Sequence, residues 1–553
     1  MRGERCRGWF AVLAILMLGC AGLWASDGAD HGASHGHHGV DGNGLPLFWA
    51  IPFAGMLLSI ALMPLVMEHF WHQNYGKVAL FWAVIFATPF WQRFGSDAIY
   101  EFAHIMLLDY VPFIILLGTL FTAAGGICLK GTLRGAPVLN SMILLLGAAL
   151  ASFMGTTGAA MLLIRPLIKA NKWRKNKVHL VVFFIFMVAN IGGSLTPLGD
   201  PPLFLGFLKG VDFFWTMKLL PLMLPMIGAL LVIFFVLDTY LYKKEGTPPD
   251  DGIREPIKLE GKINFLFLGG IIAAILFSSS LSRHELFFDH DIFASKTELV
   301  AESAKVRETT SVVLKDFVDS HEDNLDDVTK ELTVLRIAHQ DATAAANAIK
   351  SGQEHDSVIG VPILGVTVAY TNIIRDGLLV LLFILSMVVT PKATREDNFF
   401  TWEPILEVAK LFSAIFLTII PVLKILQAGV HGELAKVIWA VLEPNNEANN
   451  VMYFWLTGIL SSFLDNAPTY VVFFNTAGGD AQSLMAGTTT LLAISAGAVF
   501  MGANTYIGNA PNFMVKSIAE ENEIKMPSFF GYMAWSFGIL GPLFLILSWV
   551  FFA

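Results

Sequence analysis

The chain is poor in charged residues and in cysteine. Only 15% of its 553 residues are Asp, Glu, Lys or Arg, whereas soluble globular chains carry about 25%. This shortage excludes a cytosolic enzyme of ordinary composition, and it excludes a disordered chain. Three cysteines are too few for a disulfide scaffold or a thiolate metal cage. With 36 basic against 45 acidic residues, there is no basic excess that would indicate nucleic-acid binding.

Signatures of pumps and of enzymes are missing as well. The sequence contains no P-loop, which argues against an ATP-driven pump. It contains no His-Glu-x-x-His motif and no His/Cys cluster of the kind that holds a catalytic metal. We therefore expect a protein that is not an enzyme and that carries no cofactor.

Long apolar stretches are abundant, since 55% of the residues are hydrophobic and the mean hydropathy is +0.62. A helix that spans a bilayer needs about 20 predominantly apolar residues. Stretches of this kind lie at 45–66, 78–92, 102–128, 178–196, 213–242, 263–281, 376–391, 403–426, 488–504 and 529–552. The sequence thus predicts an all-α polytopic protein embedded in a lipid bilayer.

The N-terminal region has the pattern of a secretory signal. Residues 1–26 combine early arginines, a short apolar run and a small-residue site, which predicts a cleaved signal peptide. An uncleaved first helix is the alternative. The His/Gly-rich stretch 27–44 that follows is expected to be an extracytoplasmic leader. Such stretches can bind divalent metal, but a flexible leader with incidental histidines is the simpler interpretation.

Two further apolar blocks, 137–168 and 451–476, are each interrupted in the middle. The first is broken by Gly-Thr-Thr-Gly at 155–158, and the second by Asp-Asn-Ala-Pro at 465–468. Backbone at membrane depth must find hydrogen-bond partners, so an unwound segment survives only inside protein or beside a water-filled cavity. Each block therefore predicts a re-entrant hairpin of two short helices.

Each hairpin is followed by a second kind of break. Segments 193–204 and 502–513 share identical residues at five aligned positions, namely Gly193/Gly502, Thr196/Thr505, Gly199/Gly508, Pro202/Pro511 and Phe204/Phe513. Ordinary Pro or Gly kinks are the alternative, but they do not account for four breaks in two matched pairs. Paired interruptions in two halves are the best sequence indication of a transporter's binding site. We expect two discontinuous helices.

Basic loops orient the two halves. The loop 165–177 carries six basic residues and no acid, which predicts a cytoplasmic position. The linker 243–262 is placed inside by the same rule, and so is the segment that follows residue 391. The halves, 45–281 and 358–553, are then inverted repeats, with one hairpin entering from each side of the membrane.

Between the halves lies an acidic segment, 282–357, that is expected outside the cytoplasm. Residues 283–356 contain 16 acidic and 8 basic residues, a net charge of −8 against −9 for the whole chain. Its rhythm of apolar residues and its alanines favour helices. A functional interpretation is that the segment attracts cations or binds a partner. The alternative is a solvated helical pair without a role in transport.

Ionisable residues in apolar context are costly, so each is a candidate site residue. Asp465 comes first, because a carboxylate at a hairpin tip can bind Na⁺ and a proton in turn; a helix cap is the alternative. Asp200 follows in the first unwound segment, with a turn before Pro201 as the alternative. Both are candidate ligands for a transported Na⁺. Neutral donors at the breaks complete the set: Asn466, Thr156, Thr157, Thr196, Asn504, Thr505 and Asn509.

Four further residues are candidates for a proton relay. Asp109 lies inside the apolar stretch 102–128, and Glu403, Glu407 and Lys410 lie at the start of 403–426. The sharper hypothesis is a relay through Asp109 or Glu407. The plainer one is a Glu407–Lys410 ion pair, and either end could lie at the membrane interface.

At these residues the sequence resembles the ion-transporter superfamily, which includes NhaD-type Na⁺/H⁺ antiporters, arsenite permeases and citrate/dicarboxylate carriers. Segments 155–160, 192–200 and 465–468 are most similar to the antiporter branch. Segment 400–405 is similar to that of a bacterial group of sodium:proton antiporters or citrate-carrier-like proteins.

The resemblance covers 45–281 and 358–553, and it leaves out the leader and the acidic segment. It implies inverted repeats with two re-entrant hairpins and two discontinuous helices, and a homodimer.

Two departures from the family patterns bear on the cargo. The Ser-Asn-Thr hairpin motif of the dicarboxylate carriers is absent at both tips, which weakens the case for an organic anion. The prolines after Asp200 replace the hydroxyl residues that follow this Asp in most antiporters.

The leading hypothesis is an antiporter that exchanges Na⁺ or Li⁺ for protons across the bacterial inner membrane. A transporter of citrate, dicarboxylates or other oxyanions is the alternative, and a membrane scaffold built around the acidic segment is a third.

Overall fold

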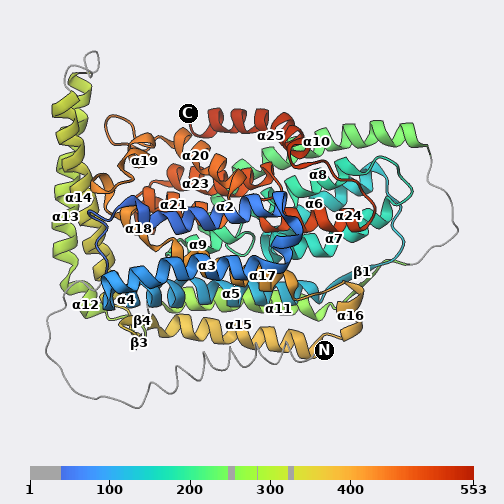
Figure 1. Ribbon diagram of the computed structural model, residues 1–553, viewed down its shortest axis with the longest axis horizontal. Helices are drawn as coiled ribbons and strands as arrows, with labels where there is room; N and C mark the ends of the chain where they lie inside the picture. Colours follow the sequence, from blue (N-terminus) through green and yellow to red (C-terminus); the bar gives the residue numbers. More distant parts are fainter. Residues whose placement is uncertain (1–38, 247–255, 283, 322–328) are drawn as a thin grey trace. The chain divides into compact units, whose positions relative to one another are not determined.

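The structure is a computed structural model that describes residues 39–246, 256–282, 284–321 and 329–553. From Val40 on, the two predicted halves and the acidic segment form one compact unit. Helices dominate it, and the strands are few and short (Figure 1). The all-α prediction is confirmed. The predicted signal peptide and residues 27–38 of the leader lie outside the described residues.

The first half begins with η2 (Leu47–Ala50), α2 (Ile51–Val66), α3 (Glu68–Phe94), α4 (Ser96–Ile105), the π-helical η3 (Met106–Tyr110) and α5 (Val111–Gly125). It continues with β1 (Cys128–Lys130), α6 (Pro137–Met154), α7 (Thr156–Ala170), α8 (Val178–Met187), η4 (Ile191–Ser194), α9 (Pro201–Leu208), η5 (Trp215–Leu219), α10 (Leu220–Glu245), β2 (Lys258–Glu260) and α11 (Ile263–Leu281). Strands β1 and β2 pair antiparallel.

The acidic segment folds into α12 (His290–Ser295), α13 (Thr297–Ser320) and α14 (Thr329–Asp356). The second half consists of β3 (Gly360–Ile363), β4 (Val366–Ala369), α15 (Tyr370–Val389), α16 (Lys392–Asp397), α17 (Glu403–Thr418), α18 (Ile420–Gln427), η7 (Gly429–His431), α19 (Ala435–Ala440), α20 (Asn450–Phe463), α21 (Asn466–Thr476), α22 (Ala481–Ala486), α23 (Thr488–Met501), η8 (Gly502–Asn504), α24 (Ala510–Glu521) and α25 (Phe529–Phe551). Strands β3 and β4 form an antiparallel hairpin.

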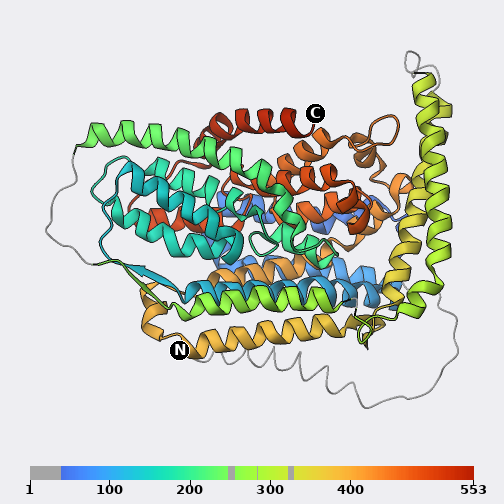
Figure 2. The same cartoon turned by 180° about the vertical axis from the view of Figure 1, so that it is seen from behind.

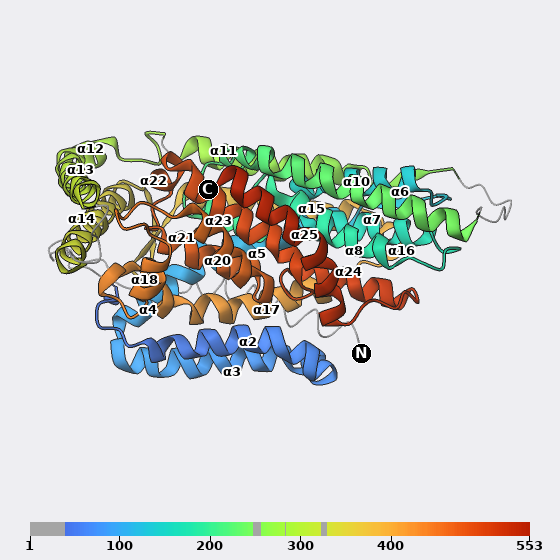
Figure 3. The ribbon, with the colours of Figure 1, turned by 90° about the horizontal axis from the view of Figure 1, so that it is seen from above.

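Within the described ranges, eight helices are long and apolar enough to cross a membrane: Leu47–Val66, Ser96–Gly125, Pro137–Met154, Trp215–Glu245, Ile263–Leu281, Tyr370–Val389, Glu403–Gln427 and Phe529–Phe551. The protein is therefore a multi-pass membrane protein. The stretch predicted at 78–92 is the C-terminal part of the longer α3. Helix α3 packs against α17, which lies beside α2 and α3 in Figure 3.

Helices of the two halves are interleaved. Helix α5 of the first half packs with α11 and with α15 of the second half (Figure 2). We call α3, α5, α11, α15 and α17 the framework helices. The hairpins α6–α7 and α20–α21 and the helix pairs α8–α9 and α23–α24 are the core helices. The core is the most deeply buried part: every residue of α8 after the first is buried.

All four predicted breaks are present in the core helices. Gly155, whose φ of 80° suits glycine, separates α6 from α7, and α20 ends just before Asp465. Helix α9 begins after Asp200 and α24 after Asn509, and both of these residues are extended, at φ −144°, ψ 142° and φ −154°, ψ 141°. A proline in the first turn of each helix fits this start. Entry of the hairpins from opposite sides of a membrane stays a prediction.

The repeat extends to hydrogen bonds. The Thr196 hydroxyl donates to the backbone oxygen of Ser152, in the first arm of hairpin α6–α7. The aligned Thr505 hydroxyl donates to the backbone oxygen of Ser462, in the first arm of hairpin α20–α21, over 2.5 Å. Each hydroxyl also accepts the N–H two residues further on, at 3.2 Å. The same threonine thus ties each unwound segment to the preceding hairpin.

The acidic segment docks on the second half through α14. The Arg336 guanidinium donates to the side chain of Asn446 at 2.9 Å, and Lys350 Nζ lies 2.9 Å from a carboxylate oxygen of Asp480. Its helical character is confirmed, and its position outside the cytoplasm stays a prediction.

Close backbone packing at two aligned glycines yields a test. A methyl group on Gly199 would collide with the backbone oxygen of Gly193, and one on Gly508 with that of Gly502. Gly199→Ala and Gly508→Ala should therefore each lower the free energy of unfolding by about 1–3 kcal/mol. Thermal unfolding of the purified protein in detergent measures this loss.

Gly228→Ala, in α10, is the matched control, because its added methyl group meets nothing within 4 Å. It should unfold at the wild-type temperature or slightly above it. Gly199→Ala and Gly508→Ala variants as stable as Gly228→Ala would contradict the close packing of the two breaks.

Candidate ion-binding site

The four breaks meet at the carboxylate of Asp200, which is 1% exposed. One of its oxygens accepts hydrogen bonds from the Thr156 hydroxyl at 3.2 Å and from the Asn509 amide at 3.0 Å. The other accepts from the Asn466 amide at 2.5 Å. Thr156 and Asn466 are the first residues of the second hairpin arms, and Asn509 is the position aligned with Asp200. One carboxylate therefore joins both hairpins and both discontinuous helices.

Helix N-termini surround this carboxylate. Helices α7, α9, α21 and α24 all begin at the breaks, and the N-terminal end of a helix carries partial positive charge. Within the described part of the chain, no cationic side chain contacts Asp200. Amide and hydroxyl donors together with helix ends therefore stabilise a carboxylate that is otherwise removed from water.

Asp465 lies at the tip of hairpin α20–α21 but does not join the other breaks. Its side chain accepts the N–H of Ala467 at 3.0 Å and caps α21. This is the arrangement expected of a helix cap. The residue is only partly buried, and it lies close enough to Asp200 for the two charges to interact. The contacts thus place Asp200, rather than Asp465, at the centre of the site.

Two buried amide oxygens at the breaks have no hydrogen-bond partner among the described residues. They belong to Asn466 and Asn504. A buried polar atom without a partner is destabilising unless a ligand or water satisfies it. The Asn466 oxygen belongs to the same amide group that donates to Asp200. Carboxylate, amide and hydroxyl oxygens are the ligands that hard cations prefer.

Asn190 and Asn512 link the two discontinuous helices, and neither was predicted from the sequence. The Asn509 amide donates to Asn190 Oδ1 at 3.2 Å, and the Asn190 amide donates to Asn512 Oδ1 at 2.7 Å. Both residues are fully buried. Each is a side-chain amide directly beside or within a predicted break, and Asn190 lies three residues before Gly193. This position is the signal that could have identified them.

Among the described residues, the remaining predicted threonines and asparagines make no hydrogen bond to Asp200. Thr196 and Thr505 bond the hairpin backbones, as described above. The Asn504 amide donates to the hydroxyl of Ser462 at 2.9 Å. Thr157 lies next to the site residue Thr156 at the start of α7. The structure thus brings Asp200, Thr156, Asn466 and Asn509 together, and the other residues frame them.

The candidates for a proton relay fall into two separate places. Asp109 Oδ2 lies 3.4 Å from Nζ of Lys209, directly after α9. Glu403, Glu407 and Lys410 lie on α17, which packs against α3, and the ammonium of Lys410 lies 5.2 Å from the centre of the Tyr75 ring. A relay through either place remains a prediction.

Two substitutions of Asp465 separate its role as a helix cap from any role of its charge. Asp465→Ala should lower the free energy of unfolding by about 1 kcal/mol, because α21 loses its cap, whereas Asp465→Asn should retain stability because Asn caps equally well. Thermal unfolding in detergent measures both variants.

Asn449→Ala is the matched control, since Asn449 caps α20, the other arm of the hairpin, by accepting the N–H of Met452 at 2.8 Å. It should lose as much stability as Asp465→Ala. A loss in Asp465→Asn equal to that in Asp465→Ala would contradict a pure capping role and would show that the charge itself matters to the fold.

The chain matches one protein-family model, described as "Putative citrate transport", over residues 42–318 and 339–552. No curated protein matches it. The match spans both halves and most of the acidic segment, and only 319–338 falls between its two parts. Helix α12 and most of α13 and α14 therefore lie within the family match, although the resemblance seen in the sequence left the segment 283–356 out.

Proposed function

Since the chain belongs to this citrate-transport family and is therefore a secondary transporter, we propose that it exchanges Na⁺ or Li⁺ for protons. The proposal rests on Asp200. It is a buried carboxylate that meets both hairpins and both discontinuous helices, and its hydrogen-bond partners among the described residues are hydroxyl and amide groups. The bacterial inner membrane and a homodimer are parts of the same proposal.

A single carboxylate in this setting binds a cation and a proton in turn. Burial disfavours the charged carboxylate on its own, so it tends to hold a positive partner. Na⁺ would be bound by Asp200, by the free amide oxygen of Asn466 and by the Thr156 hydroxyl, while a proton would satisfy Asp200 without these ligands. Occupation by one excludes the other, and this competition is the minimum requirement for antiport.

Symmetry around the site supports alternating access. The two hairpin tips contact Asp200 through corresponding residues, Thr156 and Asn466, one from each half. Withdrawal of one tip would open the site on one side while the other tip still closes it. Breaking a hydrogen bond to the carboxylate would be offset when Na⁺ or a proton takes the place of the donor.

An oxyanion such as citrate is the second candidate cargo, and the family description favours it. The N-terminal ends of four helices suit bound carboxylates. An unprotonated Asp200 would repel an anion, however, so such a substrate would bind only with a proton on Asp200 or together with a cation. Transport of citrate should then depend on low pH or on a metal ion.

Transport in reconstituted proteoliposomes distinguishes these candidates. Vesicles with an internal pH dye should report proton movement when Na⁺ or Li⁺ is added across pH 6–9.5, and should not respond to K⁺. Uptake of radiolabelled citrate is measured in parallel, with and without Mg²⁺. Citrate uptake without cation-driven proton movement would replace antiport by the second candidate.

Asp200→Asn should reduce the exchange rate by at least about a hundredfold, because an amide can neither lose a proton nor balance Na⁺. Asp465→Asn, which keeps its cap, should abolish exchange only if Asp465 is also a ligand. Asp212→Asn, an exposed position in the loop after α9, is the control and should exchange at the wild-type rate. Exchange that survives in Asp200→Asn would remove Asp200 from the ion site.

A further inference from the structure

Asp109 occupies an irregular turn outside the ion site. It lies in η3, a single π-helical turn between α4 and α5, and it is 7% exposed. Turns of this kind interrupt α-helices at a cost and are frequent at functional sites. Neither the site around Asp200 nor the proposed exchange makes use of this carboxylate.

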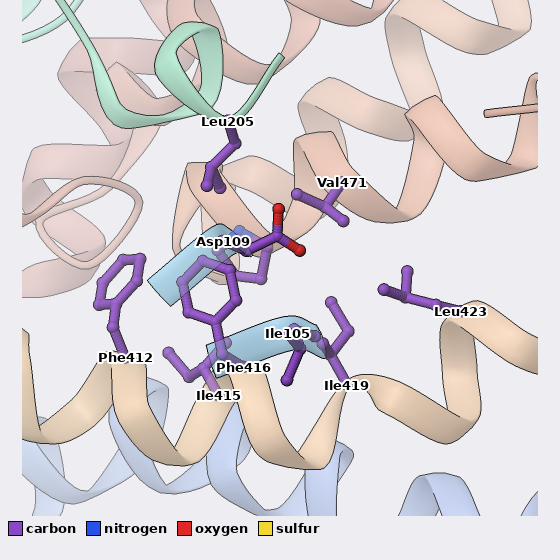
Figure 4. A pocket seen from close by; sticks show the side chains of 10 residues that line it. Ile105, Asp109, Leu205, Phe412, Ile415, Phe416, Ile419, Leu423 and Val471 are labelled. Carbon is purple, nitrogen blue, oxygen red and sulfur yellow. The ribbon is translucent and has the colours of Figure 1, made fainter. Parts of the chain in front are cut away.

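The Asp109 carboxylate points into a small apolar pocket (Figure 4). The cavity has a volume of about 10 Å³, which is barely room for one water molecule. The remaining side chains that line it are apolar: Ile105, Leu205, Phe412, Ile415, Phe416, Ile419, Leu423, Pro468 and Val471. They offer the carboxylate no hydrogen bond, so its charge depends on a partner outside the pocket.

That partner is Lys209. Its ammonium lies 3.4 Å from Asp109 Oδ2, and 20% of the lysine side chain is exposed against 9% of the aspartate. Lys209 directly follows α9, the helix that begins after Asp200. The ion pair thus joins η3, which leads into the framework helix α5, to the far end of the core helix that holds the ion-site carboxylate.

The pocket itself lies between framework and core. Helices α17 and α18 form one wall, with Phe412 and Leu423 among their residues, and α9 and α21 form the other through Leu205 and Val471 (Figure 4). Helix α9 begins directly after Asp200 and α21 begins at Asn466, and these two residues are hydrogen-bonded to each other. If α9 and α21 moved at the ion site, the pocket wall that they form would therefore shift relative to Asp109.

We propose that the Asp109–Lys209 pair is a proton-operated latch, in which α9 leaves the framework only after Asp109 has taken up a proton. If Lys209 moved away alone, it would leave an unpaired carboxylate in an apolar pocket, which is strongly destabilising. A proton on Asp109 removes that charge and releases Lys209 to the solvent. This inference rests on the proposed exchange, and it assigns a proton-coupling residue distinct from the ion-binding Asp200.

Other charged groups near the latch have their own partners or lie further away. Lys424 Nζ, on α18, lies 2.6 Å from Glu101 Oε1, which also accepts the backbone N–H of Val40. His104, one turn before η3, is close enough to interact electrostatically with both Asp109 and Lys209. Helices α17 and α21 contribute only apolar side chains to the pocket. A positive charge on His104 would favour the charged form of Asp109, and it would therefore keep the latch closed.

Cysteine labelling tests the latch without any cargo. In a chain whose three native cysteines are replaced by serine, Leu205→Cys places a thiol in the pocket wall. Its rate of modification by a soluble maleimide is measured at neutral pH and divided by the rate of Phe214→Cys, an exposed reference that corrects for thiol reactivity. The normalised rate should be low in this parent chain, because the charged pair holds α9 in place.

Asp109→Asn imitates the protonated latch, so the normalised rate of the Leu205→Cys thiol should rise about tenfold over that of the parent. Lys209→Arg, which preserves the pair, should behave like the parent. Leu379→Cys, in the buried face of α15, should stay unreactive throughout and so excludes general unfolding. An Asp109→Asn variant that keeps the parent's slow rate would overturn the latch.

A transport measurement separates this proposal from the proposed function. In Asp109→Asn vesicles, exchange of labelled for unlabelled Na⁺ should persist, while the number of protons moved per Na⁺ should fall, because only Asp200 still carries one. If the parent protein moves no Na⁺ or Li⁺, the proposed function fails, but the labelling result still decides whether Asp109 controls the release of α9. A wild-type number of protons per Na⁺ in Asp109→Asn would remove Asp109 from coupling.

Discussion

The hydrogen bonds to one buried carboxylate hold the centre of this structure together. Asp200 receives donors from Thr156, Asn466 and Asn509, and these three residues belong to the three other breaks. Unwound backbone inside an apolar protein is costly unless its polar groups find partners. The breaks satisfy one another, as where the Thr156 N–H donates to the backbone oxygen of Gly199 at 2.9 Å. Because the partners lie on different helices, each break depends on the others. A change of charge at Asp200 therefore affects the hydrogen bonds of all four breaks.

The two halves use the same local structure, but they differ at the position that carries the charge. Thr196 and Thr505 make the same bond to the preceding hairpin, and Thr156 and Asn466 both donate to Asp200 from the first position of their helices. At the start of the second discontinuous helix, however, an asparagine replaces the aspartate. Two carboxylates there would repel each other at close range, whereas an aspartate and an asparagine form a hydrogen bond. Departure from symmetry at this single pair leaves one carboxylate where the two discontinuous helices meet, and the proposed exchange would balance it with one Na⁺ or one proton.

Sequence patterns predicted the breaks well, because glycine, proline and polar residues occur together, in matched pairs, inside blocks that are otherwise apolar. They ranked Asp465 above Asp200, and the contacts favour the opposite order. Both acids lie beside a break, and only the packing of the hairpins shows that Asp465 caps its own helix while Asp200 meets the other breaks. Asn190 was not predicted as a site residue, because it follows an apolar run that resembles an uninterrupted helix. The Asp109–Lys209 pair could not be predicted from the sequence either. Its members are a hundred residues apart, and only the tertiary fold brings the end of α9 to η3.

Helix α9 would relate the proposed ion site to the proposed latch through its rigidity and its charges. Its eight residues span about 12 Å, with the Asp200 carboxylate at its N-terminal end and the Lys209 ammonium at its C-terminal end. Both charges complement the helix dipole, and together they cancel each other. A cation bound at Asp200 adds a positive charge to this unit, and the pair with Asp109 then holds the more positive helix in place. Protonation of Asp109 removes that attraction at the opposite end. A short rigid helix with a carboxylate beside each end can therefore link the occupancy of the proposed ion site to a proton, without a continuous proton path between the two carboxylates.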